Sequence, residues 1–186
     1  KLNPTPGATN VAFDGTEPLD HPYVTDPVLK VVLELPAESW TAIQADPLAE
    51  EYYQGAIEIE GERWEDVGIR TKGNSSLSHV LATGSDRFSL KVDVNAYEDQ
   101  TLLGAKKLNF NNGFKDPSFV REALTWEICR QFVPAPKSNW VKLVINGESW
   151  GIYMNCEHLD DEMLSGWYSE EDGNRYKAEG GPGANP

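Results

Sequence analysis

The chain has 186 residues, 39% of them hydrophobic, with six Trp, seven Tyr and six Phe, which is enough for a domain with a well-packed core. Thirty acidic against sixteen basic side chains give a formal net charge of −14, which opposes binding of nucleic acid and of anionic membranes over most of the surface. No apolar run reaches the length of a membrane span. Two cysteines, Cys129 and Cys156, are too few for a disulfide framework, and the sequence leaves open whether they bond to each other.

The first part of the chain predicts an arm followed by strands and one short helix. Residues 1–27 carry five prolines and little periodicity, which is typical of an extended arm rather than a core element. β-Branched runs and alternating apolar residues predict strands, and Trp40 and Ile43 lie at helical spacing. The predicted elements are a strand over 28–35, a helix over 37–45, and strands over 55–60 and 63–71.

The second part predicts one long helix among further strands. Asp116 can cap the free amides of a helix that Pro117 begins, and Pro134 lies beyond its end. Apolar residues at every fourth position predict a buried stripe on this helix: Val120, Leu124, Ile128 and Phe132. Asn146-Gly147 predicts a two-residue hairpin turn. The predicted elements are strands over 88–94 and 105–110, the long helix over 116–132, strands over 140–145 and 149–156, and a short helix over 158–166.

This order of elements predicts an α+β fold, in which an antiparallel sheet is covered by the one long helix. The domain is expected to occupy residues 28–166, between the Pro-rich arm over 1–27 and a polar, Gly-rich tail over 167–186.

One polar segment concentrates positive charge in this acidic chain. The run IRTKGNSS over 69–76 offers the cations Arg70 and Lys72, two hydroxyls and several backbone amides, which are the donors that phosphate oxygens need. The donors after the cations are Gly73, Asn74, Ser75 and Ser76. The spacing matches neither a Walker motif nor a Gly-x-Gly-x-x-Gly loop. A plain polar hairpin turn with charged strand faces remains the alternative.

The following strand, RFSLKVDV over 87–94, carries a lysine in mid-run. Phe88, Leu90, Val92 and Val94 alternate with polar residues, so Lys91 points away from the hydrophobic face. Lys91 is therefore either a ligand of a bound phosphate or a solvated lysine on an exposed strand face. The acidic residues over 157–162 allow a similar choice between a hard-cation site and a solvated start of a helix.

Several motifs together resemble the CotH-type spore coat protein kinase family, over roughly residues 60 to 180. They are RTKGNSS, RFSLKVDV, LLGAKKLNFNN, DPSFVREALTWEI, WVKLVINGESWGIYMNCEHLDDEML and NRYKAEG. The resemblance implies an atypical protein kinase that uses ATP and Mg²⁺ to phosphorylate protein substrates, with the fold of a protein-kinase small lobe. It implies that Lys91 holds the nucleotide phosphates and pairs with Glu122 on the long helix. It also implies that Arg70, Lys72 and residues 73–76 form the phosphate-facing turn, and that Glu157 borders the adenine.

The same resemblance implies that the catalytic and metal-binding aspartates follow the segment NRYK, so no catalytic residue is expected within this chain. The chain is then the ATP-binding portion of a longer kinase, inactive without the downstream lobe. The alternative is a non-catalytic structural or adhesive module of an extracellular or coat assembly. Either interpretation predicts a secreted, cell-surface or spore-coat location, and apolar surface left bare by a missing lobe would favour self-association.

Overall fold

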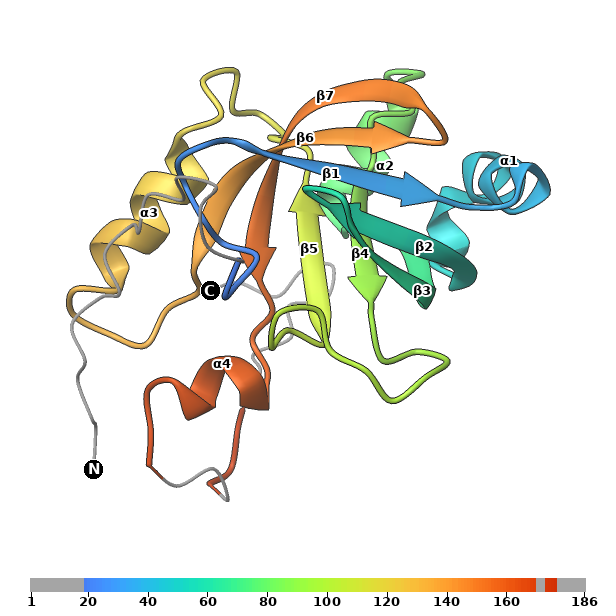
Figure 1. The fold of residues 1–186 in the computed structure, drawn as a ribbon. Coiled ribbons are helices and arrows are strands. Elements are labelled where there is room, and N and C mark those ends of the chain that lie inside the picture. Colours follow the sequence, from blue (N-terminus) through green and yellow to red (C-terminus); the bar gives the residue numbers. More distant parts are fainter. Residues whose placement is uncertain (1–18, 170–172, 177–186) are drawn as a thin grey trace.

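Seven strands form the body of the protein in the computed structural model, which describes residues 19–169 and 173–176 (Figure 1). The strands are β1 (Leu29–Glu34), β2 (Tyr53–Ile59), β3 (Glu62–Lys72), β4 (Ser89–Asp93), β5 (Lys107–Asn111), β6 (Ser138–Ile145) and β7 (Glu148–Glu157). Their order around the sheet is β1-β2-β3-β4-β5-β7-β6, and the sheet closes on itself as a barrel. All the predicted strands are present, with their ends shifted by a few residues.

The barrel closes because β1 pairs in parallel with β6, from Leu29 opposite Val141 to Leu33 opposite Ile145. The other strand pairs are antiparallel. The predicted fold class, an antiparallel sheet covered by one long helix like a kinase small lobe, is therefore wrong. The closed sheet buries its apolar residues inside itself, with Leu29, Leu33 and Phe110 fully buried, so it needs no covering helix.

The helices are short and lie outside the barrel (Figure 1). They are α1 (Ala37–Ala45), the 3₁₀ helix η1 (Pro47–Ala49), α2 (Ser75–Ala82), α3 (Arg121–Cys129) and α4 (Asp161–Ser165). The helix predicted over 37–45 is confirmed, whereas α2 was not predicted. None of the helices in the described part of the chain is long and apolar enough to span a membrane.

The predicted long helix is present only as the nine residues of α3, and its predicted buried stripe is wrong. Val120, Leu124, Ile128 and Phe132 are between 37% and 79% exposed, and the buried residue of α3 is Ala123. Val120 and Phe132 lie outside α3, and the helix contacts β6 with Ala123 as its buried residue. Asp116 accepts hydrogen bonds from the amides of Ser118 and Arg121, in the turn that precedes the helix.

Residues 19–27 form no helix or strand, yet part of this segment belongs to the core. Tyr23 and Val24 are buried in the main hydrophobic cluster. Two buried amides of the barrel interior hold the segment: Asn139 Nδ2 donates to the carbonyl of Val24, and Asn155 Nδ2 donates to that of Pro22. The end of the predicted arm is therefore packed against the barrel, while residues 1–18 lie outside the described residues.

Candidate functional site

Three of the predicted site residues, Arg70, Lys72 and Lys91, lie on the outer surface of strands β3 and β4. Leu90 and Val92 point into the barrel, so Lys91 between them points outward. The register of the strands places Arg70, Lys91, Asn109 and Cys156 in one row across β3, β4, β5 and β7. Four cations share this surface, which we call the cationic face: Arg70, Lys72, Lys91 and Lys107.

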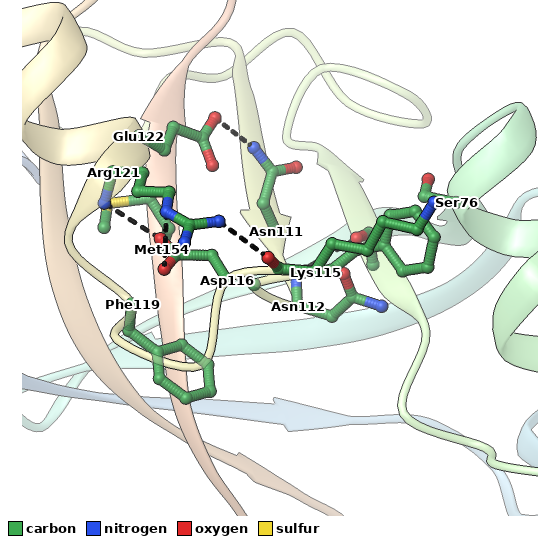
Figure 2. A pocket seen from close by; sticks show the side chains of 12 residues that line it. Ser76, Asn111, Asn112, Lys115, Asp116, Phe119, Arg121, Glu122 and Met154 are labelled. Atoms are coloured by element: carbon green, nitrogen blue, oxygen red, sulfur yellow. Dashed lines mark hydrogen bonds and ion pairs between the residues drawn. The ribbon is translucent and has the colours of Figure 1, made fainter.

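Lys72 is connected to the carboxylate of Glu122 through an amide. Lys72 Nζ donates to Asn111 Oδ1 at 2.9 Å. Asn111 Nδ2 in turn donates to Glu122 Oε1 at 2.7 Å (Figure 2). The indole of Trp126 approaches the same carboxylate oxygen at 3.5 Å. Burial lowers the pKa of Lys72, although Cys156 and Glu122 act in the opposite direction. Lys72 is thus a partly buried ammonium with an amide, not a carboxylate, as its hydrogen-bond acceptor.

Lys91 contacts a histidine instead of the predicted glutamate. Its Nζ lies 3.4 Å from His158 Nε2, and His158 Nδ1 lies 3.4 Å from the amide of Asn109. Burial and the neighbouring ammonium of Lys91 lower the pKa of His158 to about 4, so the ring is neutral near pH 7 and can accept from Lys91. Among the described residues the implied ion pair between Lys91 and Glu122 does not form.

The predicted phosphate-facing turn is partly occupied by a carboxylate of the chain itself. Glu50 accepts from Arg70 Nη1 at 2.5 Å and from the amide of Gly73 at 3.1 Å. Arg70 also stacks on Tyr52, with its guanidinium 5.1 Å from the ring centre. A guanidinium and a backbone amide are the donors expected for phosphate, and here Glu50 uses both.

The rest of that turn begins helix α2. Gly73 has a φ of +131°, and a Cβ there would come within 2.7 Å of Ser76 Oγ, so only glycine fits the approach of the chain to the helix. Asn74 and Ser75 are exposed at the first turn, whereas Ser76 faces a cavity. The segment is therefore a strand-to-helix turn and not a hairpin turn.

A cavity of about 460 Å³ opens beside Asn111, between α3, β5 and the start of α2 (Figure 2). Its wall includes hydroxyls, carboxylates, two cations and apolar side chains, among them Ser76, Ser89, Asn111, Lys115, Phe119, Arg121, Glu122 and Met154. Asp116 lies 3.7 Å from the Arg121 guanidinium at its rim. The cavity thus adjoins the side of the cationic face where Asn111 holds Lys72.

Glu157 is the one predicted site residue that lies apart from the others. It accepts from the amide of Lys137 at 2.8 Å and pairs in register with the buried Leu108, so it belongs to the inner side of the barrel wall. It lines a second cavity of about 260 Å³ together with Tyr23 and Asp160. The structure therefore brings together Arg70, Lys72, Gly73, Lys91 and Glu122, with Asn74, Ser75 and Ser76 beside them, and separates Glu157.

Four residues of the site were missed in the sequence: Glu50, Asn109, Asn111 and His158. The alternation of Leu108 and Phe110 with asparagines in the run LNFN already indicates that Asn109 and Asn111 share an outward face. No sequence signal connects Glu50 or His158 with the cationic face, because both reach it from distant segments.

His158 is expected to make folding stability rise with pH. Its folded pKa of about 4 lies below its ordinary 6.5, so the unfolded chain binds more protons between these values and stability is lost as the pH falls. Because the ring is half-exposed, we expect a contribution of about 1 to 2 kcal/mol. Asp160 opposes this effect of His158 on stability. Burial raises the pKa of Asp160 to about 6, so its protonated form stabilises the fold at low pH.

For His158→Gln we therefore expect the free energy of unfolding to fall between pH 4 and pH 6, because the contribution of Asp160 remains without that of His158. In the parent protein the two contributions oppose each other, so its free energy of unfolding stays nearly constant over this range. Urea unfolding at several pH values between 4 and 7 measures both profiles. His79→Gln, which changes an exposed histidine of α2, is the matched control. Superimposable profiles for His158→Gln and the parent protein would contradict the assignment.

Comparison with known proteins identifies similar sequences. Residues 69–185 match the model of the family described as CotH kinase protein. The inner spore coat protein H of Bacillus subtilis (strain 168) is 27% identical over 73 residues, which cover 39% of this chain and 20% of that protein. The inner spore coat protein H-like protein of the same strain is 36% identical over 84 residues, which cover 45% of this chain and 27% of that protein. The chain thus spans between a fifth and about a quarter of these relatives.

Proposed function

The chain belongs to the CotH kinase protein family, and on this premise we propose that it is the ATP-binding portion of an atypical protein kinase that phosphorylates protein substrates. The observation that supports the proposal is the cationic face on a chain whose formal charge is −14. Phosphoryl transfer depends on fixed positive charge around the phosphates, with little covalent work for the protein.

Two of the four cations lack a carboxylate partner. Arg70 pairs with Glu50 at 2.5 Å and Lys107 pairs with Asp93 at 3.7 Å, whereas Lys72 and Lys91 form no ion pair with any described residue. Burial lowers the pKa of both lysines, which means that their charged forms are incompletely compensated. Nucleotide phosphates would supply that compensation.

Lys72 and Lys91 therefore hold the phosphates in this proposal. Asn74, Ser75 and Ser76 add amide and hydroxyl donors at the first turn of α2, where the helix dipole favours an anion. Arg70 and Gly73 shape the turn through Glu50 and bind phosphate only if Glu50 moves away.

ATP and Mg²⁺ differ in how they fit the described residues. The partly buried lysines suit the phosphates of ATP. In the described part of the chain no three His, Cys, Asp or Glu side chains form a group that could hold a metal ion, so we assign no residue to Mg²⁺. Transfer of phosphate to a protein is proposed for the whole protein from the family description, CotH kinase protein, and a location in the spore coat is proposed from the names of the longer relatives.

A second candidate is a non-catalytic module of a coat assembly. The observation that favours it is the position of Glu50. This carboxylate already accepts hydrogen bonds from the Arg70 guanidinium and the Gly73 amide, which were expected to bind phosphate. In this case Lys72 and Lys91 would bind no nucleotide, and the family relationship would reflect assembly into the coat.

Calorimetric titration of the protein with ATP and Mg²⁺ separates the two candidates. Lys91→Ala is expected to weaken binding by about tenfold, since it removes one charge-assisted hydrogen bond to phosphate. Lys142→Ala, which removes an exposed lysine of β6, should bind like the parent protein. Equal affinities for Lys91→Ala and the parent protein would exclude Lys91 from the site, and absence of ATP binding would favour the coat module.

A further inference from the structure

We propose that Asn111 is a positioning residue, which presents the ammonium of Lys72 to a phosphoryl group at the mouth of the larger cavity. The inference deepens the proposed ATP-binding function and rests on it. Asn111 is the last residue of β5 and the only side chain of the described residues that hydrogen-bonds to both Lys72 and Glu122.

The path from Lys72 to Asn111 crosses the neighbouring strand β4. Lys72 pairs in register with Ser89, whose small side chain is buried and accepts from the amide of Asn112. The aliphatic part of the Lys72 side chain therefore lies over Ser89, and Lys72 Nζ reaches Asn111 Oδ1 on β5 at a distance of 2.9 Å. A larger residue at position 89 would stand in this path.

The amide keeps the charge of Lys72 available. A carboxylate at position 111 would neutralise the ammonium, whereas Asn111 Oδ1 accepts one N–H bond and carries no charge of its own. Asn111 Nδ2 is anchored by Glu122 at 2.7 Å, so the amide cannot turn away. Lys72 thus keeps a full positive charge and two further N–H donors in a place where burial makes that charge costly.

The space for a phosphoryl group lies next to Asn111, which accepts the hydrogen bond of this ammonium. The cavity of about 460 Å³ is lined by Asn111 itself, by Ser89 beneath the lysine stem and by Ser76 at the start of α2 (Figure 2). Hydroxyl groups beside an ammonium suit phosphate oxygens. With Lys115 and Arg121 of the cavity wall, Lys72 gives three cations against the carboxylates of Asp116 and Glu122, which favours an anionic ester or oligophosphate over a neutral ligand of the same size.

Asn111→Asp tests the inference with almost no change of size, and it also sets a carboxylate against Glu122 Oε1, which lies 2.7 Å from Nδ2 in the parent protein. We expect at least a tenfold loss of affinity for ATP and for inorganic tripolyphosphate in calorimetric titration, because the new carboxylate neutralises Lys72. The pKa of Lys72, measured from the pH dependence of its acylation by peptide mass spectrometry, is expected to rise. A merely structural role for Asn111 would not produce this rise. Gln44→Glu adds the same charge on exposed α1 and should change neither quantity.

Glu122→Gln serves as the second variant and predicts the opposite direction. It keeps a partner for Asn111 Nδ2 and removes a negative charge near Lys72, so affinity for tripolyphosphate should be retained or increased. A direct lysine–glutamate pair would instead require a loss. This variant remains informative if Asn111→Asp does not fold.

The outcomes separate the inference from the proposed function. If the protein binds ATP and both variants bind as the parent does, or Glu122→Gln loses affinity, the role of Asn111 is overturned while nucleotide binding stands. If tripolyphosphate binds and Asn111→Asp abolishes it while ATP does not bind, the site is an oligophosphate site and only the nucleotide function fails. Binding of neither anion overturns both.

Discussion

Replacing Arg87 by alanine is expected to lower the free energy of unfolding by about 2 to 4 kcal/mol. Arg87 precedes β4, and its guanidinium connects strands that lie far apart in the sequence. It donates to the carbonyls of Trp150 and Ile152 on β7 and to that of Asn112 after β5. It also stacks on the buried ring of Tyr153, 4.3 Å from its centre.

The loss is large because alanine would leave three carbonyls without this donor and remove the cation from the tyrosine ring. Urea unfolding followed by circular dichroism measures it. Arg87→Lys is the second variant to measure. Lysine keeps the positive charge but lacks the forked N–H donors of the guanidinium, so it should recover less than half of the lost stability. Arg63→Ala, which removes an exposed arginine on β3 with only surface ion pairs, should cost about 1 kcal/mol or less. Equal effects at Arg63 and Arg87 would contradict this account.

The strands could be predicted because each carries its own alternating pattern. Leu90 and Val92, for example, alternate with outward Lys91, and the Asn146-Gly147 turn has the positive φ angles that its sequence favours. Barrel closure could not be predicted in this way. The pairing of β1 with β6 joins residues more than a hundred positions apart, and no local pattern indicates which strands will be neighbours.

The long helix shows the limit of periodicity as a signal. Apolar residues at every fourth position define a face of α3, but only packing decides whether that face is buried. Leu124 and Ile128 are half exposed because the barrel already buries its own core. Ala123 contributes little to the pattern, although it is the residue of α3 that is buried.

The candidate site was predicted in its residue types more than in its contacts. Alternation predicted that Lys91 points outward, and charge identified Lys72 as a candidate donor to phosphate; in the structure both lie on the cationic face. The partners could not be foreseen, because Asn111 reaches Lys72 across β4 and His158 reaches Lys91 from the segment after β7. Glu50 comes from the loop after η1 and occupies donors that the sequence alone leaves free.

Replacing Asn139 by leucine is expected to lower the free energy of unfolding by about 2 to 4 kcal/mol, because it removes the side-chain donor to the carbonyl of Val24 and one of the two acceptors of Asn155 Nδ2. Asn139 is fully buried on β6, where Nδ2 donates to the carbonyl of Val24 at 2.6 Å. Its Oδ1 accepts from Asn155 Nδ2 at 3.0 Å. Leucine fills the space but can neither donate to the first group nor accept from the second.

The same pair predicts a non-additive double variant. In Asn139→Leu/Asn155→Leu both partners of the buried amide contact become apolar, so the loss should be smaller than the sum of the two single losses by about 1 kcal/mol or more. Urea unfolding of the four proteins gives this coupling energy, and hydrogen exchange of residues 19–27 reports whether the segment detaches. We expect faster exchange around Tyr23 and Val24 in each single variant. Additive losses with unchanged exchange in this segment would mean that the two asparagines do not fasten it to the barrel.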